Sequence, residues 1–217
     1  MQEDAKLAVT QALRAAILKG EYAPKQRLVE IDLCERFETS RFILRSALQE
    51  LSAQGLVEFQ RNRGARVREV SLAEAIEITQ VRILLEGFLA ARAAERVSKP
   101  EATMLRKIIK DMRTAVGKSE LLVYSDLNAS LHAAIRDIAD HETTARLLRQ
   151  LRDQTVRHQF SLSLVPGRPS VSLPQHEAIV TAISARKPAE AQQAMRDHLD
   201  SVIQAFQVLA AASARHN

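Results

Sequence analysis

The stretch Leu33–Leu56, LCERFETSRFILRSALQELSAQGL, decides the fold of this chain. Its residues predict a short helix, a tight turn at Glu38-Thr39 and a second helix that Ser40 opens. The apolar residues of the second helix recur at helical spacing and are expected to be buried. They are Leu44, Leu48 and Leu51. Gly55 ends the helix, because glycine tolerates the left-handed conformation of a helix C-terminus. A second helix with a polar, cationic first turn is typical of an element that reads a DNA major groove.

The residues on either side complete a winged helix-turn-helix. Residues 5–19 have the period of an amphipathic helix, and residues 21–27 form the connection to the quoted stretch. After that stretch, residues 56–60 (LVEFQ) change to the period of a strand. Residues 62–64 (NRG) supply turn chemistry, and residues 65–70 return as a second strand. Three helices followed by a β-hairpin form a winged helix-turn-helix, in which the arginine-rich tip of the hairpin is the wing.

Charge is concentrated at the predicted wing. The chain has 217 residues, a formal net charge of +5 and only 4% aromatic residues, which favours helix over sheet. A mildly basic balance is common, so the distribution says more than the total. Between Gln60 and Arg68 the sequence contains arginines and no acid. They are Arg61, Arg63, Arg66 and Arg68. This run indicates an anionic partner.

The sequence predicts a cytoplasmic protein that does not associate with a membrane. Cys34 is the single cysteine, which excludes an intramolecular disulfide and fits a reducing compartment. No apolar run approaches the ~20 residues that a membrane-spanning helix requires. The first residues, MQEDAKLAVT, lack the charged-then-apolar order of a signal peptide.

Beyond residue 70 the sequence predicts only helices. Ser71-Leu-Ala-Glu74 reads as a capping box that starts the first of them. The expected helices run over residues 71–97, 98–117, 119–139, 142–164, 173–185 and 188–211. The only strong loop signal is at residues 165–170 (VPGRPS). We therefore expect a mainly α protein with two domains: a winged helix-turn-helix at 1–70, and an all-helical effector-binding and dimerisation domain at 71–217.

The first of these domains resembles the GntR-type transcriptional regulators. Between Leu13 and Val67 the resemblance is carried by LRAAILKGEYAP, RLVEIDLCERFETSR and LRSALQELSAQGLVEFQRNRGARV. It implies that residues of the second helix and of the wing contact operator DNA. These are Ser40, Arg41, Phe42, Arg45, Arg61, Asn62, Arg63 and Gly64. The chemistry agrees, because arginine can donate two hydrogen bonds to guanine. The alternative is that the arginines form only a solvated face.

Three positions depart from the family. Lys25 stands where glycine usually follows the proline, and Phe42 and Ile43 replace the small or proline residues common after the Ser-Arg pair. Since Phe42 lies where relatives contact a base, the operator sequence does not transfer to this chain.

The second domain resembles the FCD domain, the ligand-binding domain of the FadR branch of this family. The motifs are VRILLEGFLAARAAERV (Val81–Val97), NASLHAAI (Asn128–Ile135) and PQHEAIVTAISARKPAEAQQAMRDHL (Pro174–Leu199). Together the two resemblances span nearly the whole chain.

Three of the predicted helices each direct one histidine toward the interior: His132, His176 and His198. Asn128 precedes His132 by one helical turn on the same side. Buried imidazoles need hydrogen bonds or a shared ligand. Each one alone favours a hydrogen-bonded core residue. Together, at positions where metal-binding relatives carry ligands, they favour a divalent cation, Zn²⁺ or Ni²⁺. Relatives often carry aspartate where this chain has Asn128, a weaker, uncharged donor.

An open coordination position on such a metal predicts that a small carboxylate effector binds there. Arg82 is the candidate second anchor, and the alternative is an ion pair with Glu86 one turn on. The leading function is thus an effector-controlled regulator that binds operator DNA as a homodimer, and the resemblance implies a repressor that its ligand releases. Two alternatives stay open: a metal-responsive sensor without an organic ligand, and a metallohydrolase. The hydrolase lacks a placed general base, because Glu177 is expected to face away from His176.

Overall fold

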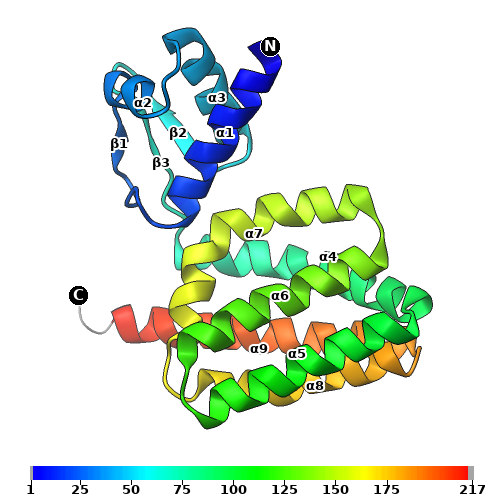
Figure 1. Ribbon diagram of the computed structural model, residues 1–217. Coiled ribbons are helices and arrows are strands. Elements are labelled where there is room, and N and C mark those ends of the chain that lie inside the picture. Colours follow the sequence, from blue (N-terminus) through cyan, green and yellow to red (C-terminus); the bar gives the residue numbers. More distant parts are fainter. Residues whose placement is uncertain (1, 215–217) are drawn as a thin grey trace. The chain divides into compact units, whose positions relative to one another are not determined.

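A computed structural model describes residues 2–214 of the chain and the side chains of residues 2–211. The chain clusters into two compact units. The first comprises residues 1–71 together with 152–156, and the second comprises residues 72–151 and 157–217 (Figure 1). The domain limits 1–70 and 71–217 remain a prediction from the sequence.

The first unit is a winged helix-turn-helix. Its elements are α1 (Gln2–Leu18), β1 (Arg27–Leu28), α2 (Glu30–Arg36), α3 (Arg41–Ala53), β2 (Val57–Gln60) and β3 (Gly64–Val67). The predicted leucine stripe of α3 lies at the centre of the core, where Leu44, Leu48 and Leu51 are fully buried. Leucines of α1 and α2, Leu13 and Leu33, close over it. The periodicity that predicted the helix therefore also predicted its buried face.

Local signals in the sequence account for the limits of α3. The Ser40 hydroxyl is the N-cap and accepts a hydrogen bond from the backbone N–H of Ile43 at 3.3 Å. Glu38 in the preceding turn has a φ of 47°, and Gly55 after the helix has a φ of 75°. The turn and the helix end thus lie where the sequence predicted them.

The sheet has three strands, although the sequence predicted only a hairpin. Its order is β1-β3-β2, with antiparallel pairs throughout. The prediction that residues 21–27 are only a connection was wrong at its end, because Arg27 pairs with Arg66 and Leu28 with Ala65. Two residues are too few to show a period of two, so only the pairing partner reveals this strand.

Lys25 adopts the left-handed backbone conformation, with a φ of 64°, which explains why glycine is usual at this position. We expect Lys25→Gly to stabilise the protein by about 0.5–1 kcal/mol, because relief of the left-handed strain exceeds the added chain entropy of glycine. The reference is Lys25→Ala, since it loses the ion pair of the ammonium with Glu69 (2.5 Å) but keeps the strain. Urea unfolding of both variants measures the difference. Equal stabilities would show that the backbone conformation is not strained.

The second unit is all-helical, as predicted. Its elements are α4 (Leu72–Arg96), α5 (Lys99–Gly117), α6 (Leu121–Ala139), α7 (Glu142–Ser163), α8 (Arg168–Ser184) and α9 (Pro188–Ala214). Helix α4 packs on α6, α8 and α9, while α5 packs on α6 and α8 (Figure 1). Ser98 and Glu101 form the capping box of α5. Within residues 2–214, none of the helices has the apolar length that crossing a bilayer requires.

Helix α8 begins five residues earlier than the predicted start at Leu173. Pro169 lies in its first turn, where a missing N–H leaves no helical hydrogen bond unmade. Pro174 lies inside the helix, although the sequence analysis placed the helix start beside it. The predicted loop at residues 165–170 therefore shrinks, and this places Arg168 on the same helix as His176.

Candidate DNA-binding surface and histidine cluster

The first turn of α3 presents a cationic and aromatic surface. Arg41 and Arg45 are exposed, and Phe42 is 67% exposed. Phe42 is the most exposed phenylalanine among the described residues. In a major groove the ring can contact the methyl group of thymine. The sequence-predicted residues Arg41, Phe42 and Arg45 thus share one exposed turn, next to the N-cap Ser40.

Glu30 of α2 holds the side chain of Arg45, a contact that the sequence analysis did not predict. The Arg45 Nε donates to both carboxylate oxygens of Glu30, each at 3.0 Å. The side chain of Arg45 remains 64% exposed. Because Glu30 is contacted through Nε, the two terminal nitrogens of Arg45 are available to recognise guanine or a phosphate.

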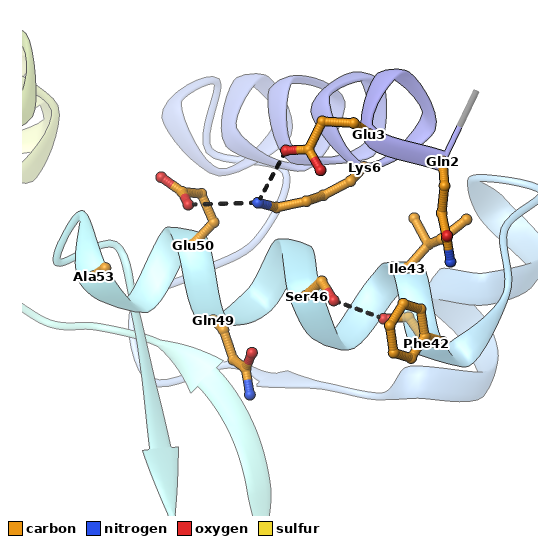
Figure 2. A pocket seen from close by; sticks show the side chains of 9 residues that line it. All are labelled: Gln2, Glu3, Lys6, Phe42, Ile43, Ser46, Gln49, Glu50 and Ala53. Carbon is orange, nitrogen blue, oxygen red and sulfur yellow. Dashed lines mark hydrogen bonds and ion pairs between the residues drawn. The ribbon is translucent and has the colours of Figure 1, made fainter.

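The exposed face of α3 continues beyond the predicted residues. Figure 2 shows Phe42, Ser46 and Gln49 one after another along the helix, with the Ser46 hydroxyl donating to the carbonyl oxygen of Phe42 at 3.1 Å. Their spacing of four and three residues is the sequence signal that would have found Ser46 and Gln49. In the groove between α1 and α3, the charge of Lys6 is paired with acidic side chains: its ammonium lies 3.6 Å from Glu3 and 3.9 Å from Glu50.

The wing tip is exposed from Arg61 to Gly64. Gln60 pairs with Gly64 across the hairpin, so a three-residue turn joins β2 to β3. Asn62 and Gly64 have φ values of 62° and 78°, conformations that asparagine and glycine tolerate. The turn therefore presents Arg61 and Arg63 at the end of a short, well-defined hairpin.

The three predicted histidines converge inside the second unit. His132 of α6, His176 of α8 and His198 of α9 are buried, and one ligand atom of each lies within 4.8 Å of the others. The ring centroids of His176 and His198 are 4.3 Å apart. Those of His132 lie 5.6 Å from His176 and 5.5 Å from His198. Three imidazoles this close can share a single ligand.

Each ring has a hydrogen-bond partner at Nδ1, and the sequence analysis missed all three partners. His132 Nδ1 lies 2.8 Å from Glu86 Oε2, His176 Nδ1 lies 3.2 Å from the Tyr124 hydroxyl, and His198 Nδ1 lies 3.0 Å from Gln175 Oε1. The oxygens of Glu86 and Gln175 can only accept, so they place the proton of His132 and His198 at Nδ1 and present Nε2 as the lone-pair donor. The Tyr124 hydroxyl can accept from His176 in the same way. Gln175 is adjacent to His176 in the sequence, whereas Glu86 lies 46 residues from His132 and Tyr124 lies 52 residues from His176.

Electrostatics and unsatisfied atoms in the cluster fit a cation. Burial, followed by the neighbouring imidazoles, lowers the pKa of both His176 and His198 well below the usual value, so both rings are neutral ligands at pH 7. The Nε2 atom of His176 and the Oδ1 atom of Asn128 are buried and accept no hydrogen bond. Neutral nitrogen donors and an unsatisfied oxygen form a donor set that suits Zn²⁺ or Ni²⁺.

Arg82 forms the ion pair that was its alternative role. Its Nε and Nη2 lie 2.8 Å and 2.7 Å from Oε1 of Glu86, and both side chains are 3% exposed. The same carboxylate reaches His132 through its other oxygen, so Arg82 is linked to the cluster. Nη1 of Arg82 is buried and has no hydrogen-bond partner. The ion pair therefore leaves one donor of Arg82 unused.

The first unit is a winged helix-turn-helix whose α3 is exposed and cationic, and the second is an all-helical unit around a buried polar cluster. This combination defines a DNA-binding protein with a separate sensor domain. The sequence matches the model of the bacterial regulatory proteins of the gntR family at residues 5–67 and that of the FCD domain at residues 77–201. The chain belongs to the gntR family of regulators and carries an FCD domain, an architecture consistent with the FadR branch.

Named relatives agree with this family. The chain is 25% identical over 194 residues to the HTH-type transcriptional repressor RspR of Escherichia coli, covering 89% of this chain and 85% of RspR. It is 28% identical to the HTH-type transcriptional regulator LutR of Bacillus subtilis, covering 86% and 94% of the two chains. The solved structure of E. coli McbR/YncC shares the fold with a TM-score of 0.77 at 18% identity, over 95% of this chain and 98% of that one.

Proposed function

We propose that this protein is a transcriptional repressor whose homodimer binds operator DNA through α3 and the wing. Its affinity for the operator is controlled by a small carboxylic acid bound at a metal site in the FCD domain. The observation that carries the proposal is the set of three buried imidazoles that each offer a ligand atom within 4.8 Å of the others and each have a hydrogen-bond partner at Nδ1. Because operator DNA is the partner, we place its action in the cytoplasm.

The DNA-binding residues of the proposal are those of the exposed first turn of α3 and of the wing tip. Arg41 and Arg45 are the base-reading candidates, and Phe42 adds an apolar contact. The wing residues Arg61 to Gly64 are candidates for phosphate or minor-groove contacts, because cations at a narrow tip approach the backbone closely. Exposure of every one of these side chains supports the assignment.

The metal-binding residues of the proposal are His132, His176 and His198, with Asn128 as the oxygen donor. A divalent cation held by them supplies an open coordination position for an acid oxygen. Glu86, Tyr124 and Gln175 orient the rings from outside, as carboxylate and amide partners do around metal-bound histidines.

The unused Nη1 of Arg82 is the anchor that we propose for the effector carboxylate. A buried guanidinium nitrogen without a partner gains strongly from a carboxylate. Helix α4 carries both Arg82 and Glu86 and starts at Leu72, so four residues separate it from the end of β3 at Val67. A shift of α4 on effector binding is therefore transmitted to the wing through a short covalent link.

A homodimer is supported by an exposed apolar stripe on α4. Val81, Leu84 and Phe88 follow one another at helical spacing and are 46%, 60% and 40% exposed. Large apolar side chains in such a row mark an interaction surface more often than a solvated one. A second copy of the chain would supply the second DNA-binding domain that a two-fold symmetric operator requires.

The two other functions are less well supported by the geometry. A metallohydrolase needs a carboxylate free to act as a base. Glu86 uses one oxygen on Arg82 and the other on His132, and Glu177 binds Arg113 at 2.6 Å. A metal sensor without an organic ligand would leave the buried Nη1 of Arg82 without a role.

Arg61→Ala should reduce the salt dependence of DNA binding. If Arg61 neutralises one phosphate, the slope of log K against log salt becomes smaller by about one. Fluorescence anisotropy with a labelled duplex between 50 and about 200 mM salt covers the range in which this slope is measured. The control is Arg146→Gln, which removes one exposed charge from α7. An unchanged slope would remove Arg61 from the phosphate-binding set.

The proposed function is tested by titrating the zinc-loaded protein with small organic acids and measuring its affinity for DNA upstream of its own gene. We expect specific binding without acid and at least about tenfold weaker binding with the cognate acid, which is an allosteric coupling of ordinary size. Binding that responds to zinc but to no acid would favour the metal sensor. An acid that raises the affinity for DNA would make the protein an activator, or a repressor whose co-repressor is the acid.

A further inference from the structure

Arg168 is a half-buried cation of the FCD domain that has no counter-charge. Its Nη1 donates to the carbonyl oxygen and to the hydroxyl of Ser201, at 3.2 Å and 2.9 Å. Its Nη2 is buried and has no hydrogen-bond partner. Within the described residues, no carboxylate forms an ion pair with Arg168. A guanidinium with a buried nitrogen that makes no hydrogen bond and with no neighbouring carboxylate is stabilised when an anion binds to it.

The side chain of Arg168 reaches toward the histidine cluster. Its Cα lies eight residues before His176, about 12 Å along α8. Its guanidinium nevertheless binds Ser201, which follows His198 on the neighbouring helix α9 by three residues, about 4.5 Å of helix rise. The guanidinium therefore lies less than one turn of α9 beyond the level of His198.

Hydroxyl groups lie between Arg168 and the cluster. Ser172 is buried one turn after Arg168 and one turn before His176 on the same helix. The buried hydroxyl of Tyr124 lies 3.2 Å from His176 Nδ1 and is also hydrogen-bonded to Ser172. Such hydroxyls and a free guanidinium nitrogen are the donors that bind an acid group.

The charges on the two sides of the cluster differ. On the α4 side, Glu86 compensates Arg82. On the α8 side, Arg168 has no such partner, and Asn128 is neutral. One acid group bound at the metal and Arg82 would leave the charge of Arg168 uncompensated. A second negative charge near the start of α8 would therefore compensate Arg168.

We propose that Arg168, with Ser172, forms a second anion subsite, and that the effector is a small acid with two acidic groups. This inference rests on the proposed function, because it names the class of ligand for the same site. One acid group binds at the histidine cluster and Arg82, and the other binds Nη2 of Arg168. A monoacid of the same chain length leaves Nη2 unsatisfied.

Calorimetric titration of the zinc-loaded full-length protein with matched acids tests the second subsite. The pairs are succinate and butyrate, malate and 2-hydroxybutyrate, glutarate and valerate, and 2-phosphoglycolate and glycolate. In at least one pair we expect the diacid to bind about tenfold or more tightly than its partner, as a charge-assisted hydrogen bond provides. Arg168→Gln should reduce that preference to less than about twofold, because the variant lacks the guanidinium that the second acid group binds.

Two further variants keep the test decisive. Arg146→Gln removes an exposed charge elsewhere and should keep the preference for the diacid. Ser172→Ala should weaken the diacid more than the monoacid, and it replaces Arg168→Gln if that variant does not fold. The proposal is overturned if no diacid is preferred, or if the preference survives in both subsite variants. Monoacids that bind and alter DNA affinity without any diacid preference would refute the second subsite alone. No response to any acid would refute the proposed function as well.

Discussion

His176→Gln is expected to abolish stoichiometric zinc binding. The ring of His176 lies 4.3 Å from that of His198, and its Nε2 is buried without a partner. Changing an outer partner of a metal ligand typically lowers affinity about 10–100-fold, so loss of a ligand should lower it by more than about 100-fold. Metal analysis after desalting measures the loss directly.

The same variant should lose the stabilisation that zinc gives to the wild type. A ligand present at about 100 times its dissociation constant stabilises the native state by about 2.7 kcal/mol. Thermal unfolding with and without zinc should therefore separate for the wild type and coincide for His176→Gln. The matched control is His158→Gln, which removes a histidine of α7 that lies outside the cluster. Retention of one equivalent of zinc by His176→Gln would show that the cluster is a hydrogen-bonded core.

Glu86→Gln should give a graded version of this result. The amide keeps the shape of the side chain but weakens its contacts with Arg82 and His132. We expect zinc affinity to fall about 10–100-fold, the usual effect of an altered outer partner. Affinity equal to that of the wild type would separate the Arg82–Glu86 pair from the metal site.

The second large effect is expected on operator affinity when a residue of α3 is changed. Arg45→Ala should weaken binding to the operator by about 1–3 kcal/mol, the value of one bidentate base contact, while affinity for random duplex changes little. Competition titrations with operator and random DNA at one salt concentration measure this ratio. The control is Arg106→Ala, which removes an exposed arginine of α5. Equal losses on both DNAs would assign Arg45 to a backbone contact.

Helical periodicity explains why much of this molecule could be predicted from its residues. Leu44, Leu48 and Leu51 repeat with the period of a helix, so their burial follows from their spacing. The same argument placed His132, His176 and His198 on interior faces of three helices. Their convergence was predicted from those faces together with the family resemblance.

What the sequence analysis missed depends on contacts between distant segments. Glu86 and His132 are 46 residues apart, and no local pattern connects them. Strand β1 is defined only by its pairing with β3. The early start of α8 places Arg168 on the same helix as His176, and the sequence did not show it because Pro174 is typical of the first turn of a helix. Each of these features bears on the site rather than on the fold class.

The central claim is that this FCD domain senses an acid through its metal site and thereby controls DNA binding. The most direct measurement is the affinity of zinc-loaded wild type and His176→Gln for duplex DNA from upstream of the protein's own gene, with and without the diacid preferred by the wild type. We predict that both proteins bind this DNA more tightly than random DNA, and that the diacid weakens binding only for the wild type. Equal affinity for upstream and random DNA, or the same response to the diacid in both proteins, would contradict the account.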